Sequence, residues 1–199
     1  MKILSLVDGS KTSAVVALAF VLAVAAFLLC GCASTASNGN DQIVKAAIEL
    51  AEEYRSLGRL EDSIGVYDKA LERTYDYRLL YNKALTIANL GDFEQAAALC
   101  QEGHGSFPYI LAFKKAQAKY YIELERWQDA ASSYIEVLEL DPYDTSTRKA
   151  LISLYVTNNE PSKAAEQATI LWNQGYRTAE TVGLMKVSLD PSLESSQED

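Results

Sequence analysis

The stretch that decides the fold is "GDFEQAA", residues 91–97, in which a glycine and an acid precede an aromatic residue and a pair of alanines. Three other stretches share this order of a turn-forming or polar residue, a bulky residue or proline, and small residues near the end: "GRLEDSI" from Gly58, "ERWQDAA" from Glu125 and "NEPSKAA" from Asn159. Their first positions are 33, 34 and 34 residues apart. A fixed period of this length indicates four copies of one structural unit.

Small residues recur at two places in each copy, and they explain why the copies should be helical pairs. Ala84 and Ala96 occupy these places in the second copy, and Ala118 and Ala130 occupy them in the third. Two helices that cross closely need small side chains where they touch. Each copy is therefore predicted to be two helices joined by a turn, with Gly58 and Gly91 at that turn because a left-handed backbone costs glycine least.

This pattern resembles the tetratricopeptide repeat, a 34-residue helix–turn–helix unit. The resemblance covers Val44 to about Thr178 and implies an all-α solenoid of about four repeats, at 44–76, 77–110, 111–144 and 145–178. The stretch "AETVGLMKVSL", from Ala179, would form a capping helix, because the last repeat of a solenoid otherwise exposes its apolar face. We expect the domain to span 41–189 and the polar residues 190–199 to be a disordered tail.

The chain before the repeats has the composition of a targeting segment. Residues 12–29 carry no charge and are mostly apolar, which suits a membrane span or the core of a secretory signal. The run ends in "LCGC", residues 29–32, and this order of an aliphatic residue, a loosely restricted residue, a small residue and a cysteine resembles the lipobox of bacterial lipoproteins. The resemblance implies that residues 1–31 are a signal peptide, that Cys32 is lipidated, and that 32–40 form a flexible tether. An uncleaved anchor helix is the alternative.

The cysteines and the single histidine do not indicate catalysis or metal binding. Cys30 and Cys32 are separated by one residue, whereas redox and zinc motifs usually have two between their cysteines. Cys100 falls at an inward position of a second helix, so we expect a buried small hydrophobe. His104 lies at a helix end, and no phosphate loop or H-E-x-x-H motif accompanies it. We therefore expect no enzyme, no cofactor and no metal.

The charge of the chain limits its partners. Lys and Arg number 18 and Asp and Glu number 27, for a net charge of −9, so phosphate backbones are repelled and nucleic acid is not an expected partner. No small-molecule substrate is evident. Tetratricopeptide proteins usually bind proteins on the concave face lined by the first helix of each repeat. That resemblance places these residues in a partner-binding groove: Arg78, Tyr81, Asn82, Leu85, Lys115, Lys119 and Lys149.

The predicted groove carries lysines and an aromatic residue, so its partner would be an acidic or helical protein segment. The alternative is that these lysines only solvate a helix face. A further family site, the two-carboxylate clamp of chaperone-binding members, is not supported. Asn82 occupies one clamp position, but the other clamp positions hold Ile48, Glu52, Ala112 and Ala116.

Together these features predict a membrane-anchored scaffold that mediates protein–protein interactions in the bacterial cell envelope. The chain resembles lipoproteins that assist the assembly of envelope complexes. An accessory partner of a periplasmic solute-binding or transport system is the alternative. Ala33, after the lipidated Cys32, is not an acidic retention residue, so the rules known for enteric bacteria predict the outer membrane, with the domain facing the periplasm.

Overall fold

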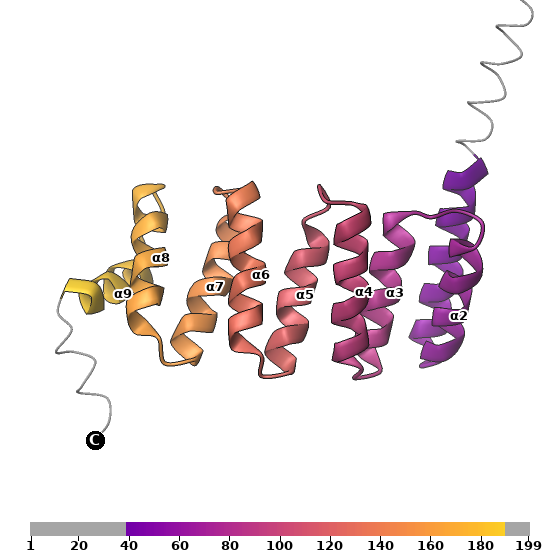
Figure 1. Cartoon of the computed structure of the whole chain (residues 1–199), viewed down its shortest axis with the longest axis horizontal. Helices are drawn as coiled ribbons and strands as arrows, with labels where there is room; N and C mark the ends of the chain where they lie inside the picture. The colour runs from indigo at the N-terminus through magenta and orange to yellow at the C-terminus, as the bar shows by residue number, and fades with distance from the viewer. Residues whose placement is uncertain (1–38, 190–199) are drawn as a thin grey trace, which may run out of the picture. The chain divides into compact units, whose positions relative to one another are not determined.

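The computed structural model describes residues 39–189, and these are α-helices joined by short turns (Figure 1). No strand occurs within this range, as the repeat pattern predicted. Residues 39–56 are helical, and the later helices are α2 (Leu60–Leu71), α3 (Tyr77–Asn89), α4 (Phe93–Ser106), α5 (Ala112–Glu123), α6 (Trp127–Leu140), α7 (Thr145–Thr157), α8 (Pro161–Asn173) and α9 (Ala179–Leu189).

Several predictions fall outside the described residues. They are the signal peptide at 1–31, lipidation of Cys32, the tether up to residue 38 and the tail at 190–199. Gly39 and Asn40, which the sequence analysis placed in the tether, are helical. Among the helices that the structure describes, none combines the length and the apolar run needed to cross a bilayer.

The chain divides into two compact units, Met1–Ala46 and Ala47–Asp199. The described part of the first unit is helical, and Lys45 Nζ lies 2.8 Å from the carboxylate of Asp41, one helical turn before it. The second unit contains α2–α9. Within it each helix from α2 onward contacts the next helix along the chain. The stacked helix–turn–helix pairs form a tetratricopeptide-repeat solenoid.

Two sets of helices alternate along the second unit. The first helices of the repeats are residues 47–56, α3, α5 and α7, and the second helices are α2, α4, α6 and α8. Helix α9 follows the fourth repeat and packs against α8. The first helices form one surface of the unit, and the second helices form another.

The turn inside each repeat contains one residue with a left-handed backbone. Gly58 and Gly91 have φ angles of 74° and 86°, which confirms their predicted place at the turns. Glu125 and Asn159 occupy the same aligned position and have φ angles of 56° and 54°. Side chains with a Cβ rarely adopt this conformation, so the geometry of the repeat imposes the turn on two non-glycine residues.

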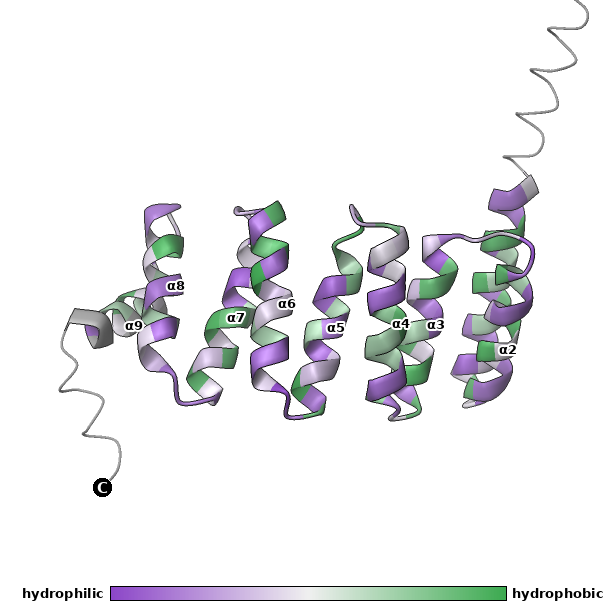
Figure 2. Ribbon diagram, in the orientation of Figure 1, coloured by the Kyte–Doolittle hydropathy of each residue, from purple (hydrophilic) through white to green (hydrophobic). Residues whose placement is uncertain are grey.

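The core lies where the helices of a repeat cross. Apolar and polar residues are mixed along each of the helices α2–α8 (Figure 2), and the buried residues of these helices are mostly apolar. Ala84 and Ala96 are fully buried in one cluster, and Ala118 and Ala130 are fully buried in the next, as the small-residue pattern predicted. Gly103 allows an even closer approach, because a Cβ at this position would overlap the ring of Phe113.

Candidate protein-binding surfaces

Charge is separated between the two sets of helices. Helices α3, α5 and α7 carry one acid, Glu123, and the following bases: Arg78, Lys83, Lys114, Lys115, Lys119, Arg148 and Lys149. Helices α2, α4, α6 and α8 carry two bases, Lys69 and Lys163, and the following acids: Glu61, Asp62, Asp68, Glu94, Glu102, Asp129, Glu136, Glu139 and Glu166. Helices α3, α5 and α7 are therefore basic although the whole chain is acidic. The first helix of the first repeat, residues 47–56, is an exception, because it carries Glu49, Glu52 and Glu53 and one base, Arg55.

Some of these bases join first helices to second helices. Lys83 on α3 lies 2.6 Å from a carboxylate oxygen of Asp68 on α2. Lys114 on α5 lies 2.6 Å from a carboxylate oxygen of Glu136 on α6, and its side chain is 13% exposed. These ion pairs link helices within and between repeats, so the lysines that form them are not available to a partner without breaking an internal contact.

Arg78 and Asn82, from the predicted groove, are bound to the first turn of their own helix. The guanidinium of Arg78 lies 2.9 Å and 3.0 Å from the two carboxylate oxygens of Asp76, and Asp76 also accepts a hydrogen bond from the backbone N–H of Arg78 at 2.8 Å. Nδ2 of Asn82 donates to the carbonyl oxygen of Arg78 at 2.8 Å. Arg78 therefore holds the capping carboxylate of α3 in place, and Asn82 is held against the backbone of its own helix.

Tyr81 and Leu85 are half-buried and pack against the cluster that contains Phe113. The rings of Tyr81 and Phe113 meet edge to face, with centroids 5.7 Å apart and planes at 79°. Burial raises the pKa of the Tyr81 hydroxyl, and the nearby charge of Lys115 opposes this rise. The charge of Lys115 on α5 therefore acts on the Tyr81 hydroxyl on α3.

Lys115 also forms an ion pair with Asp144, the residue that caps the N-terminus of α7. Burial acts to raise the pKa of the Asp144 carboxyl. Hydrogen bonds from Lys115, from the Ser146 side chain and from the side chain and backbone of Thr147 outweigh burial and hold that pKa well below its usual range. Lys115 therefore stabilises the junction between the third and fourth repeats.

Lys119 and Lys149 remain the most accessible cations of the predicted groove. Both are exposed, and neither forms an ion pair in the part of the chain that the structure describes. The ammonium of Lys149 lies 5.9 Å from the centroid of the Tyr176 ring. A partner can reach both lysines without breaking an internal salt bridge.

The buried polar chemistry of residues 39–189 is structural. Cys100 is fully buried, and burial raises the pKa of its thiol to about 12, so the prediction of a buried small hydrophobe is confirmed. Burial, followed by the charge of Lys114, lowers the pKa of the half-buried His104. No group of three or more His, Cys, Asp or Glu side chains in this range could hold a metal ion.

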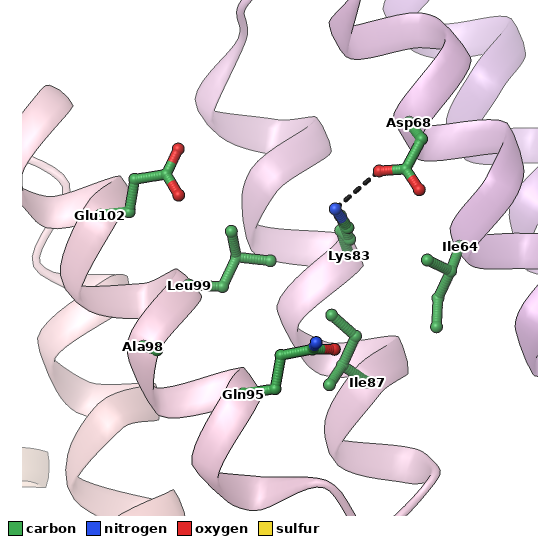
Figure 3. A pocket seen from close by; sticks show the side chains of 8 residues that line it. All are labelled: Ile64, Asp68, Lys83, Ile87, Gln95, Ala98, Leu99 and Glu102. Carbon is green, nitrogen blue, oxygen red and sulfur yellow. Dashed lines mark ion pairs between the residues drawn. The ribbon is translucent and has the colours of Figure 1, made fainter.

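A second surface was missed in the sequence analysis: a groove of about 380 Å³ between α2 and α4, with α3 beneath it (Figure 3). We call it the α2/α4 groove, and its lining residues are Ile64, Asp68, Lys83, Ile87, Gln95, Ala98, Leu99 and Glu102. Ala98, a small and exposed residue among the residues that line the groove, was the available signal.

Known proteins share this architecture. A family model described as "Tetratricopeptide repeat" matches residues 48–109. A tetratricopeptide repeat protein from Parabacteroides merdae superposes on this chain with a TM-score of 0.63 and 15% sequence identity. The superposition covers 78% of this chain and 64% of the Parabacteroides protein, so this chain spans less than two thirds of that protein's length. MamA from Desulfovibrio magneticus RS-1 superposes with a TM-score of 0.55 and 14% sequence identity, and the superposition covers 79% of this chain and 98% of the MamA chain.

The first repeat domain of Spaghetti (RPAP3), solved with an HSP90 peptide, gives a TM-score of 0.52 at 20% identity, covering 58% of this chain and 93% of that chain. At these identities the similarity establishes the fold. Tetratricopeptide repeats generally mediate protein–protein interactions, and the fold is generally a non-enzymatic scaffold.

Proposed function

We propose that this chain is a lipid-anchored scaffold that binds protein partners in the bacterial cell envelope through its first helices. The observation that carries the binding role is the excess of bases on α3, α5 and α7, where Lys119 and Lys149 are exposed. Tyr81 and Leu85 add partly exposed apolar surface on α3. An acidic protein segment suits this face, because opposite charge increases the rate of association while apolar contacts supply most of the affinity.

The residues at the clamp positions do not support binding of a peptide like the HSP90 peptide SRMEEVD in the structure of Spaghetti (RPAP3). A clamp for two carboxylates needs donors, and Ala112 and Ala116 occupy two of the clamp positions in this chain. Ala116 is also 4% exposed, so it adds little surface. We therefore expect an internal acidic segment of an envelope protein, bound along the first helices.

The anchoring role rests on the sequence from Leu29 to Cys32. Two or three acyl chains are needed for stable attachment, because one chain binds a membrane only marginally. Lipidation of Cys32 would supply such an anchor, and Ala33 after it favours the outer membrane with the domain in the periplasm. The assembly of an envelope complex is the role that such a tethered scaffold would serve.

The anchor is tested by metabolic labelling with a palmitate analogue in the native cell. Cys32→Ala should abolish the label and leave an unprocessed precursor, whereas the matched variant Cys30→Ala should label and process normally. Normal labelling of Cys32→Ala would refute lipidation at this position.

The binding face is tested by site-specific photo-crosslinking in native membranes. A benzophenone amino acid at the exposed Ser153 of α7 should yield crosslinked partner proteins, whereas the same group at the exposed Gln128 of α6 should not. Equal crosslinking from both positions would show that partners do not distinguish the first helices from the second helices.

A further inference from the structure

We propose that the α2/α4 groove is a second docking surface, which takes a basic amphipathic helix of a protein partner. This surface is distinct from the face proposed above, because α2 and α4 are second helices and carry the opposite charge. The inference rests on the shape of the groove, on its charge and on the way the next repeat differs from it.

The floor of the groove is apolar and its walls are low. Ile64 from α2, Ile87 from α3 and Leu99 from α4 meet along the floor (Figure 3). Ala98 lines the groove from α4 and is exposed. This small residue leaves room on the α4 side of the groove, and an apolar floor between two helices suits the helix-in-groove mode of recognition.

Carboxylates define the edges of the groove. Asp68 lines it from α2 and Glu102 lines it from α4. The Tyr75 hydroxyl donates a hydrogen bond to Glu102 at 2.9 Å, and the Tyr75 ring stacks on Phe107 with centroids 5.8 Å apart. These contacts hold Glu102 in place, and its carboxylate keeps further acceptor sites for a partner.

The net charge around the groove selects a basic partner. Lys83 and Asp68 line the groove and pair with each other, so their charges offset. Asp62 on α2 and Glu94 on α4 are likewise paired, with Arg59 and Arg126. Glu102 is the lining carboxylate that has no ion pair within residues 39–189, and it leaves the lining residues with a net negative charge. Phosphate-bearing ligands are repelled by such a surface. Lysine or arginine side chains one turn apart on a helix can reach both edges while an apolar residue between them contacts the floor.

The next repeat shows that this groove is not a general property of the fold. One repeat along the chain, Gln117 and Tyr121 replace Lys83 and Ile87. Nε2 of Gln117 donates to the Tyr121 hydroxyl at 3.2 Å and to Oε1 of Gln101 at 3.3 Å. Tyr121 takes the place of the floor residue Ile87, and it is hydrogen-bonded to Gln117. The next site therefore has a polar floor, and a helix that fits one site does not fit the other.

The test uses the full-length protein in zwitterionic nanodiscs and a fluorescein-labelled 16-residue model helix, with a leucine stripe flanked by lysines. Empty nanodiscs give the background. We expect saturable binding by fluorescence anisotropy, and a twin peptide with glutamate in place of each lysine should not bind. Ala98→Arg, which fills the groove and adds a positive charge at an exposed position, should weaken binding about tenfold or more, the equivalent of about 1.4 kcal/mol.

Ser153→Arg adds the same side chain at an exposed position on α7 and should leave binding unchanged within about twofold. The double variant Lys119→Glu/Lys149→Glu should also leave binding of the model helix unchanged. The docking role of the α2/α4 groove and the binding role of the first helices are therefore tested independently. Circular dichroism checks that each variant is folded. The proposal is overturned if the lysine and glutamate peptides bind equally well, or if Ala98→Arg binds the lysine peptide as well as the native protein does. Absence of binding above the background of empty nanodiscs also overturns it.

Discussion

Lys115 on α5 and Asp144 at the N-terminus of α7 form an ion pair that joins the third and fourth repeats. Asp144 also accepts hydrogen bonds from the Ser146 hydroxyl at 2.6 Å and from the backbone N–H of Thr147 at 3.1 Å. One carboxylate therefore caps a helix and anchors a lysine from the preceding repeat. The pair uses a lysine that sequence analysis assigned to partner binding.

Removing this carboxylate should destabilise the solenoid. Loss of an N-cap costs about 0.5–2 kcal/mol, and Asp144→Ala also leaves Lys115 without its partner. Asp92 caps α4 by accepting from the backbone N–H of Gln95 at 2.9 Å, so Asp92→Ala removes a cap alone. Urea unfolding at pH 7 should show a larger loss for Asp144→Ala than for Asp92→Ala. Equal losses would mean that Lys115 adds nothing.

The contribution of Asp144 should depend on pH in one direction. The folded state lowers the pKa of this carboxyl, so its stabilisation is fully present above the unfolded pKa of about 4 and is lost as the pH falls toward the folded pKa. The difference in unfolding free energy between the native protein and Asp144→Ala should therefore shrink from pH 7 to pH 2.5. A difference that stays constant would contradict a role for the ionised carboxylate.

Two glycine substitutions should change stability in opposite directions. Gly103→Ala places a Cβ against the Phe113 ring, and overpacking of this kind costs about 1–3 kcal/mol. Gly65→Ala has open space around the new Cβ and should stabilise α2 by about 0.5–1 kcal/mol. Thermal unfolding of both variants checks this, and Phe113→Leu should partly rescue Gly103→Ala. A stabilised Gly103→Ala variant would contradict the close approach of α4 and α5.

The fold could be predicted because it depends on residues that recur. The aligned turn position holds Gly58, Gly91, Glu125 and Asn159, and all four adopt the same left-handed conformation. The alignment alone shows that Glu125 and Asn159 take the place of glycine, so their strained backbone was foreseeable. The fully buried Ala130 was predictable in the same way.

The candidate site was less predictable, because side-chain partners depend on contacts between repeats. Helical spacing put Lys115 and Lys119 on one face of a helix, but it could not show that Asp144 pairs with Lys115 and leaves Lys119 exposed. The α2/α4 groove depends on the separation of two helices that are not neighbours in the chain. Residue patterns within one helix do not report that separation.

The strained turn in the third repeat offers a stabilising substitution. Glu125 has a φ angle of 56°, and the left-handed conformation costs a residue with a Cβ roughly 1 kcal/mol more than glycine. Glu125→Gly should therefore raise the unfolding free energy by up to about 1 kcal/mol, whereas Glu125→Ala, which keeps the Cβ, should not. Chemical denaturation distinguishes the two, and a less stable Glu125→Gly variant would argue against strain at this turn.

The thiol of Cys100 should be inert in the folded protein. It is fully buried, and its pKa is raised to about 12, so little thiolate forms at pH 8 and reagents have no access. Alkylation by iodoacetamide, followed by mass spectrometry, should be slow in buffer and rapid in denaturant. Fast alkylation of the native protein would contradict the packing of α4 in its cluster.

Binding of partners by the first helices is tested most directly by a quantitative pull-down from crosslinked native membranes. The bait carries Lys119→Glu and Lys149→Glu, at two exposed lysines of the first helices that form no ion pair within residues 39–189. Lys69→Glu with Lys163→Glu makes the same change in charge on the second helices and is the matched control. We expect the first bait to lose the partners that bind the first helices and the second bait to keep them. A folded Lys119→Glu/Lys149→Glu protein that recovers the full set of partners would contradict a binding role for this face.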